Sequence, residues 1–303
     1  MKLLITGAAQ LNPELILSLE NLGWEVTILK QEKDGVEAPE FYDAVVCNNL
    51  FAHTPVERFS NLKFIQLTSA GLDRVPLSFI RDHGIIIKNA RGVYSKPMAE
   101  WVIAVILNEY KALPGFALNQ KEKSWIKNRN LKELTDKKIA IIGAGNIGDE
   151  IAKRLKAFDT QIDGFDVAEF SKSDYDKILH IEKLDPANYD IIIISAPSTK
   201  DNYHFIDGDF LRKMKKDSML INISRGNLLD ESSIISALTE RPDLVLCLDV
   251  FEQEPLGVSS KLWEFDNVRI SPHNSFVGEY NSKRLHKVII QNLEEFLQKE
   301  SEK

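Results

Sequence analysis

Three residues suited to proton and charge chemistry each follow a strand-like apolar run in the second half of the chain. They are Arg225, Glu254 and His273, which come directly or shortly after the runs 219–224, 245–250 and 268–271. An arginine can bind a carboxylate through two parallel hydrogen bonds, and a histidine can transfer a proton near neutral pH. A glutamate beside that histidine would hold it and favour its charged form. Taken singly, each also has a structural interpretation, as a loop cap, a solvated turn residue and a surface histidine.

The elements that must position these residues are signalled by a glycine motif at 143–148. An apolar run at 139–142 leads into three glycines spaced G-x-G-x-x-G, and apolar residues then recur at helical spacing up to Phe158. In such a strand–turn–helix the glycines allow a tight turn, close approach of a pyrophosphate and helix–strand packing, and the helix N-terminus offers N–H groups to the phosphates. The motif residues expected at a dinucleotide are Gly143, Gly145, Asn146, Ile147 and Gly148.

An acidic residue at the end of the next predicted strand fits the same site. The run 161–166 ends in Asp166, which lies 166 − 148 = 18 residues after the last glycine of the motif. A carboxylate here can accept hydrogen bonds from both ribose hydroxyls of NAD and would repel the 2′-phosphate of NADP. Val167 and Ala168 supply no cation for that phosphate, so we expect NAD as the cofactor. A purely structural turn with a surface aspartate remains an alternative, as does a methyltransferase, although the complete glycine spacing argues against the latter.

Strand-like runs alternate with helical patterns along the chain, which predicts parallel α/β sheets. Continuous apolar runs such as 85–87 suit a sheet that is covered on both faces. We expect two doubly wound parallel-sheet domains. One is a Rossmann-type NAD-binding domain at 98–278, and the other is a flavodoxin-like substrate domain made of 1–97 and 279–303, which includes a final amphipathic helix at 281–298.

A long and unusually apolar helix is predicted from Pro97 to Leu113, with Pro97 in its first turn and Pro114-Gly115 at its end. A helix that is apolar on most sides is either buried or forms an interface, so we expect a homodimer through this helix. The polar stretch 120–135, which contains Trp125, is predicted to be a surface excursion.

Composition narrows the classes of function. The net charge of −7 argues against a nucleic-acid partner, and no run reaches the roughly 18 apolar residues of a membrane-spanning helix. Cys47 and Cys247 lie in apolar segments, which favours buried free thiols in the cytoplasm. A disulfide or a catalytic thiol is the alternative. No two histidines or cysteines have ligand spacing, so no metal site is expected.

Together these motifs resemble those of the D-isomer-specific 2-hydroxyacid dehydrogenases, in particular the hydroxypyruvate and glyoxylate reductase-like or phosphoglycerate dehydrogenase-like members. The matching stretches span most of the chain in the family's order. They are Ser69–Asp73, Asn89–Val93, Met98–Trp101, Gly143–Gly148, Ser195–Pro197, Ile221–Gly226, Leu248–Pro255 and Ser271–His273.

The resemblance implies that Arg225, Glu254 and His273 form a catalytic set and that Asp249 lies near the nicotinamide carboxamide. Further cofactor contacts that it implies are Ala196, Pro197, Asn202, Ile223 and Ser224; family members often have Thr where Asn202 stands. It also implies that the amides of Ser69, Ala70 and Gly71 help to hold a substrate carboxylate. From the residues alone, this small-residue loop could equally be an ordinary strand–helix turn.

The implied reaction is reversible hydride transfer between NADH and a small 2-oxo acid, which gives a D-2-hydroxy acid. In this reaction Arg225 would hold the carboxylate, His273 would donate the proton and Glu254 would stabilise the imidazolium. The alternative is a non-enzymatic NAD-responsive binding protein, as in corepressors of the same fold. We expect the enzyme, because no extra tail or partner-binding segment is seen in the sequence.

Overall fold

The computed structural model describes residues 1–302 and divides into two compact units. The first unit contains residues 1–94 together with the segment from Gly278 onward, and the second contains residues 95–277. Each unit is built on one sheet in which every strand pair is parallel. This confirms the predicted class of two doubly wound α/β folds.

The sheet of the first unit has five strands in the order β2-β1-β3-β4-β5. This is the flavodoxin-like order, in which the direction of winding reverses beside β1. The strands are β1 (Lys2–Thr6), β2 (Glu25–Leu29), β3 (Ala44–Cys47), β4 (Phe64–Leu67) and β5 (Ile86–Lys88).

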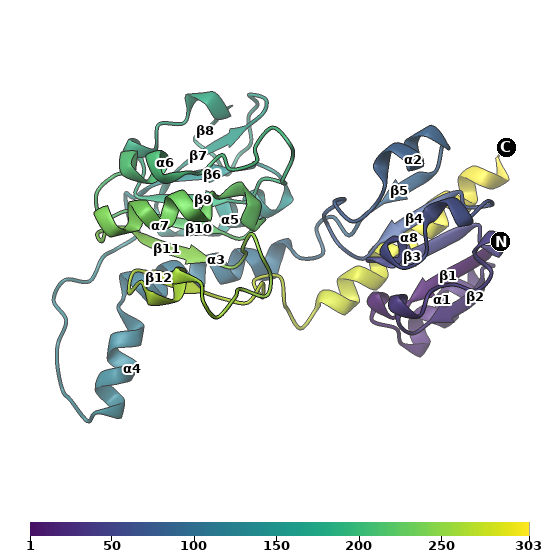
Figure 1. The fold of residues 1–303 in the computed structure, drawn as a ribbon, viewed down its shortest axis with the longest axis horizontal. Helices are drawn as coiled ribbons and strands as arrows, with labels where there is room; N and C mark the ends of the chain where they lie inside the picture. Colours follow the sequence, from purple (N-terminus) through teal and green to yellow (C-terminus); the bar gives the residue numbers. More distant parts are fainter. Residues whose placement is uncertain (303) are drawn as a thin grey trace. The chain divides into compact units, whose positions relative to one another are not determined.

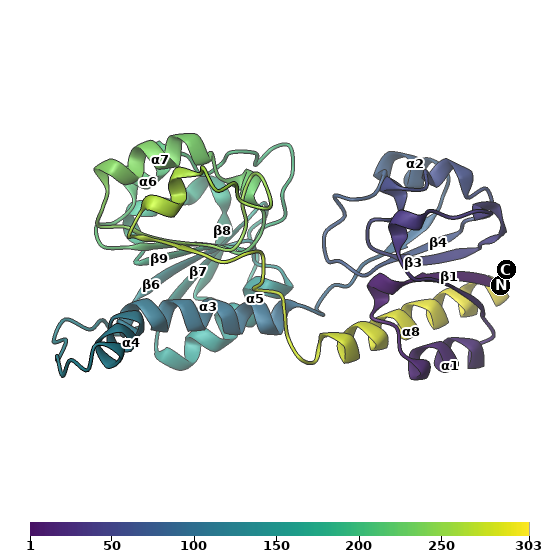
Figure 2. The same ribbon diagram turned by 60° about the horizontal axis from the view of Figure 1, so that its bottom comes forward.

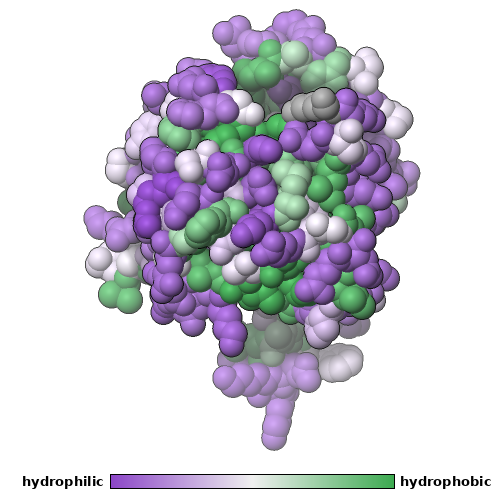
Figure 3. Space-filling view, turned by 90° about the vertical axis from the view of Figure 1, so that its right-hand side faces the viewer, coloured by the Kyte–Doolittle hydropathy of each residue, from purple (hydrophilic) through white to green (hydrophobic). Residues whose placement is uncertain are grey.

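Helices cover both faces of this sheet (Figure 2). On one face lie α1 (Pro13–Asn21) and the long C-terminal helix α8 (Asn281–Ser301), and on the other lies α2 (Leu77–Asp82). The buried side of α8 contributes Leu285, Ile289, Leu293 and Phe296 to the core formed with α1 and the sheet. Figure 3 shows the face of this unit that carries the chain ends, where hydrophilic residues predominate and hydrophobic ones lie between them.

The sheet of the second unit has seven strands in the order β12-β11-β10-β9-β6-β7-β8. Its winding reverses between β6 and β9, which is the switch point of a Rossmann fold. The strands are β6 (Lys138–Ile142), β7 (Gln161–Asp166), β8 (Lys177–His180), β9 (Ile191–Ile194), β10 (Met219–Asn222), β11 (Val245–Leu248) and β12 (Val268–Ile270).

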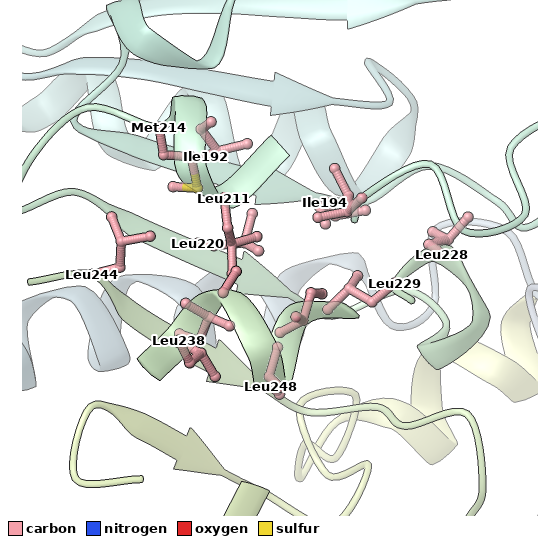
Figure 4. Close-up of a cluster of buried hydrophobic side chains, with 14 of the residues drawn as sticks. Ile192, Ile194, Leu211, Met214, Leu220, Leu228, Leu229, Leu238, Leu244 and Leu248 are labelled. Carbon is pink, nitrogen blue, oxygen red and sulfur yellow. The ribbon is translucent and has the colours of Figure 1, made fainter. Parts of the chain in front are cut away.

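Two pairs of helices cover this second sheet (Figure 1). The helices α3 (Ser95–Tyr110) and α5 (Asn146–Leu155) pack against each other, and α6 (Gly208–Lys213) packs against α7 (Glu231–Glu240). Figure 4 shows the apolar core beneath α6 and α7, where Ile192, Leu220 and Leu248 of the central strands meet Leu211 and Leu238 of the helices. The packed strands β9, β10 and β11 therefore fix the points from which the loops at their carboxyl ends begin.

The prediction that Pro114-Gly115 end the long apolar helix was wrong. The helix α3 ends at Tyr110, and a second helix, α4 (Leu113–Lys121), contains both residues. Ala112 turns the chain with a φ of 50°. Pro114 fits the first turn of α4 because backbone N–H groups in the first turn of a helix have no intrahelical partner, so the N–H that proline lacks is not needed there. None of the residues of α4 is buried, so the sequence carried no apolar periodicity that could have revealed it.

Within residues 1–302, no individual helix has the length and apolar character to cross a bilayer. The bent pair α3 and α4, with 63° between them, meets those criteria only when the two are counted together. Cys47 and Cys247 are free and buried, as predicted, and burial raises the pKa of the Cys247 thiol to about 12.

Candidate active site

The structure places His273 and Glu254 in direct contact beyond the carboxyl ends of β11 and β12. Nδ1 of His273 lies 2.7 Å from Oε2 of Glu254. The other carboxylate oxygen, Oε1, accepts a hydrogen bond from the backbone N–H of Phe251 at 3.1 Å, which fixes the orientation of the glutamate. Because Nδ1 faces the carboxylate, Nε2 is the nitrogen left to exchange a proton with a ligand. The ring is met edge-on by Phe276, with 5.7 Å between ring centroids.

The backbone of His273 is held by Asp249. The N–H of His273 donates to the carbonyl oxygen of Asp249 at 2.8 Å, and His273 itself has a φ of 50°. That left-handed conformation is uncommon for a residue other than glycine, so the surrounding structure has to enforce it.

The side chain of Asp249 holds the same loop and has no exposed surface. Its Oδ1 accepts from the hydroxyl of Ser271 and, at 2.8 Å, from the N–H of Asn274, while Oδ2 accepts from the N–H of Ser275 at 2.9 Å. A buried carboxylate requires such donors. Asp249 thus organises the loop that carries His273, whatever its role toward a nicotinamide.

Arg225 lies in the loop after β10 and is partly buried. One guanidinium nitrogen donates to the carbonyl oxygen of Ser224 at 2.9 Å, and the carbonyl oxygen of Arg225 accepts from the side chain of Asn222 at 3.0 Å. Gly226 brings this loop against the one that carries Glu254. A Cβ on Gly226 would lie 1.8 Å from the carbonyl carbon of Phe251, so only glycine permits this approach.

A second link between these loops involves residues that the sequence did not single out. Glu231 and Glu252 each accept the backbone N–H of the other, at 2.7 Å and 3.0 Å. Nε2 of the His204 ring lies 3.0 Å from Oε1 of Glu252. The backbone N–H of His204 donates to the carbonyl oxygen of Asn227 at 3.0 Å. This cluster, which also has Asp230 nearby, ties the segment before Glu254 to the segment after Arg225.

The glycine motif has the geometry that its spacing predicts. Gly143 has a φ of 93°, and a Cβ there would lie 2.5 Å from the backbone nitrogen of Ala196. A Cβ on Gly148 would lie 2.3 Å from the carbonyl oxygen of Gly143, so this glycine is needed for helix–strand packing. A Cβ on Gly145, in contrast, would meet nothing within 4 Å.

The open space at Gly145 is where a ligand phosphate would fit. Gly145 is the N-cap of α5 and supplies no side-chain cap, and the N-terminus of a helix favours an anion through its backbone N–H groups and its dipole. Asp166 ends β7 and binds the same turn: its Oδ2 accepts from the N–H of Ala144 at 2.9 Å and its Oδ1 from the N–H of Val167 at 2.8 Å. The residues present therefore fit a dinucleotide.

The remaining cofactor candidates lie in neighbouring loops beyond the same sheet edge. The hydroxyl of Ser224, next to Ile223, donates to the carbonyl oxygen of Ala196. The side chain of Asn202 closes its own loop, because it donates to the carbonyl oxygen of Pro197 at 2.8 Å and accepts from the N–H of Thr199 at 2.7 Å. Asn202 thus shapes this loop, whether or not it touches the cofactor.

The proposed carboxylate loop lies in the first unit, directly after β4. The hydroxyl of Ser69 donates to the carbonyl oxygen of Gly71 at 3.1 Å, and the side chain of Asn89 donates to the carbonyl oxygen of Ala70 at 2.6 Å. These bonds use the carbonyl groups, so they are compatible with amides that face a ligand. The role of the loop in substrate binding remains a prediction.

A parallel sheet with a glycine-rich turn at its switch point is the class of fold that binds dinucleotides, and a histidine–glutamate pair lies at the same edge of this sheet. The model of the NAD-binding domain of D-isomer specific 2-hydroxyacid dehydrogenases matches residues 103–275. The chain belongs to this family, and it is an enzyme that uses a nicotinamide dinucleotide.

Relatives with assigned activities are similar over most of the chain. Glyoxylate reductase of Thermofilum pendens is 33% identical over 248 residues, which cover 77% of this chain and 71% of that protein. Hydroxypyruvate reductase of Thermotoga maritima is 31% identical over 269 residues, which cover 86% of each. Among solved structures, D-lactate dehydrogenase of Aquifex aeolicus in complex with NAD and lactic acid has a TM-score of 0.78 at 21% identity, covering 99% of this chain and 96% of that one. This last similarity concerns the fold.

Proposed function

We propose that the protein reduces a small 2-oxo acid with NADH to a D-2-hydroxy acid, and that His273 is the acid and base of this reaction. The observation that carries the proposal is the contact of 2.7 Å between His273 and Glu254 at the carboxyl edge of the NAD-binding sheet. The names of the relatives support a substrate such as glyoxylate or hydroxypyruvate.

Each residue of the set has one task in this proposal. Arg225 binds the substrate carboxylate through its planar guanidinium and polarises the carbonyl group. The bound nicotinamide supplies the hydride. His273 gives the proton on Nε2 to the carbonyl oxygen, while its Nδ1–H stays bonded to the Glu254 carboxylate.

A panel of 2-oxo acids tests the proposal. Purified protein is mixed with NADH and glyoxylate, hydroxypyruvate, pyruvate or larger 2-oxo acids, and NADH oxidation is followed by absorbance. Turnover with at least one short 2-oxo acid is expected. The product of hydroxypyruvate or pyruvate, which is chiral whereas the glycolate formed from glyoxylate is not, should be the D isomer by chiral chromatography. Tight NADH binding without turnover of any acid would instead favour the corepressor-like alternative, and a mainly L product would contradict the assigned stereochemistry.

We further propose that NAD is preferred over NADP because the Asp166 carboxylate faces the ribose 2′ position. Replacing Asp166 with Ala is expected to narrow the ratio of kcat/KM for NADH to that for NADPH by roughly tenfold, the factor that about 1.4 kcal/mol gives. Steady-state kinetics with both cofactors measure this ratio. A wild-type enzyme that is more efficient with NADPH would remove the basis of this assignment.

The homodimer remains a proposal that α3 and the arm that follows it support. In Figures 1 and 2, α4 and the segment after it lead away from the sheet of their own unit. This arm exposes apolar side chains, with Leu118 54%, Trp125 95% and Ile126 65% accessible. An apolar extension of this kind suits a second copy of the chain.

Replacing Trp125 with Glu is therefore expected to shift the protein from dimer to monomer in analytical ultracentrifugation, because the charge would have to be desolvated at the interface. Val258→Glu is the matched control, since Val258 is 99% exposed and belongs to a loop outside the arm. A wild-type protein that sediments as a monomer would refute the proposal. We also propose a cytoplasmic location, in line with the two free thiols, and no nucleic-acid partner, in line with the net charge of −7.

A further inference from the structure

After β7 the chain folds back and places Lys172 against the glycine-rich turn. Nζ of Lys172 donates to the carbonyl oxygen of Ala144 at 2.6 Å and lies 2.8 Å from each carboxylate oxygen of Asp149. The same ammonium lies 5.3 Å from the centre of the Phe170 ring. Asp149 belongs to the first turn of α5, so a cation is bound at the element that the motif assigns to the cofactor.

Lys172 and Asp166 both bind the backbone of Ala144. The N–H of Ala144 is bonded to Asp166 at 2.9 Å, and the carbonyl oxygen of Ala144 is bonded to Lys172. Only the backbone of Ala144 therefore separates the ammonium of Lys172 from the carboxylate of Asp166, which is the group expected at the ribose of the cofactor. NADP carries a phosphate at the ribose 2′ position and NAD does not, so the charges near this position decide which of the two cofactors binds more tightly.

The ion pair that holds Lys172 is not locked in a core. The side chains of Lys172 and Asp149 are 35% and 36% exposed, and a lysine has a flexible four-carbon stem that can redirect its charge. The ammonium can turn toward a phosphate only if it leaves Asp149. Two carboxylates thus favour NAD over NADP. Asp166 repels the 2′-phosphate of NADP, and Asp149 retains the cation that would attract this phosphate.

We propose that Lys172 is a specificity-determining residue for the cofactor and that Asp149 holds it away from the ribose 2′ position. This inference rests on the NAD preference proposed above and names a second source for it. When a neutral residue replaces Asp149, Lys172 is released and can bind the 2′-phosphate. NADPH then binds more tightly, while NADH binding changes little.

The test measures dissociation constants for NADH and NADPH by the fluorescence of the bound nicotinamide, without substrate. Asp149→Asn is expected to lower the ratio of the NADPH constant to the NADH constant about fivefold, the size of effect that one partly exposed ion pair gives. The double variant with Lys172→Met should restore the wild-type ratio. Glu169→Gln is the matched control, because Glu169 lies in the same loop but accepts its bond from Lys183, at 2.5 Å.

Each outcome decides the proposal. An unchanged ratio in Asp149→Asn, or a fall that persists without Lys172, overturns it. If Asp149→Asn fails to fold, Asp149→Ser carries the test. It also removes the carboxylate that holds Lys172, so the ratio must fall, and a ratio that rises or stays constant overturns the proposal. Tighter binding of NADPH by the wild type would refute the NAD preference itself, before any variant is made.

Discussion

Replacing His273 with Gln is expected to lower kcat/KM for reduction of the best 2-oxo acid by roughly 10²- to 10⁴-fold, the usual contribution of a general acid. Gln can donate a hydrogen bond to Glu254 but cannot deliver a proton at neutral pH. The dissociation constant for NADH should stay within about twofold of the wild type, a free-energy change of roughly 0.4 kcal/mol. Stopped-flow absorbance of NADH at a series of pH values measures the effect on the hydride step.

Glu254→Gln is the partner variant for this experiment. It keeps the shape of the side chain and puts a neutral amide in place of the carboxylate that lies 2.7 Å from Nδ1 of His273. Its reductive kcat/KM should therefore fall by roughly tenfold or more, since a hydrogen bond to a charged group contributes about 1.5–3 kcal/mol. A His273→Gln enzyme with wild-type kcat/KM would exclude the histidine as the acid, and an unchanged kcat/KM in Glu254→Gln would show that the charge of the glutamate has no part in the reaction.

The second large effect is expected from Gly226→Ala. The added methyl group would lie 1.8 Å from the carbonyl carbon and 2.0 Å from the carbonyl oxygen of Phe251, and backbone atoms cannot rotate away as a side chain can. The loops of Arg225 and Glu254 must then separate. We expect the free energy of unfolding to fall by at least about 3 kcal/mol, together with most of the activity. Urea denaturation followed by circular dichroism measures the first quantity.

Gly145→Ala is the control that separates stability from function. Its methyl group meets no atom within 4 Å, and the N-cap difference between the two residues costs about 1 kcal/mol at most. NADH affinity should nevertheless fall, because the methyl group occupies the space left for a phosphate. Equal stability losses in the two variants would show that the Gly226 contact is not decisive for the fold.

The sheet architecture and the chemical residues could be predicted because both leave local signals. Apolar runs of four or five residues reveal each central strand, and Arg225, Glu254 and His273 stand at their carboxyl ends. Topology then requires these ends to share one edge, which is how the contact between His273 and Glu254 arises from residues far apart in sequence.

The features that escaped prediction depend on how distant segments meet. The sequence gives no sign that Asp249 binds three donors at Ser271, Asn274 and Ser275, because those bonds form only when β11 and β12 lie side by side. Val167 and Ala168, directly after Asp166, carry no cation, whereas Lys172 returns to the motif through a fold in the chain. In both cases the residue type was visible and its neighbours were not.

The division of the first unit between the two ends of the chain affects the order in which the protein can fold. Its core includes Leu285, Ile289, Leu293 and Phe296 of α8, beside Leu15 and Leu19 of α1. During synthesis the N-terminal strands and α1 emerge first, yet α8, which covers one face of their sheet together with α1, emerges only after the whole second unit. Domains usually fold as units while the chain is being made. The second unit, which is continuous in sequence, can therefore be complete on the ribosome, while the first unit has only α1 on this face until α8 emerges.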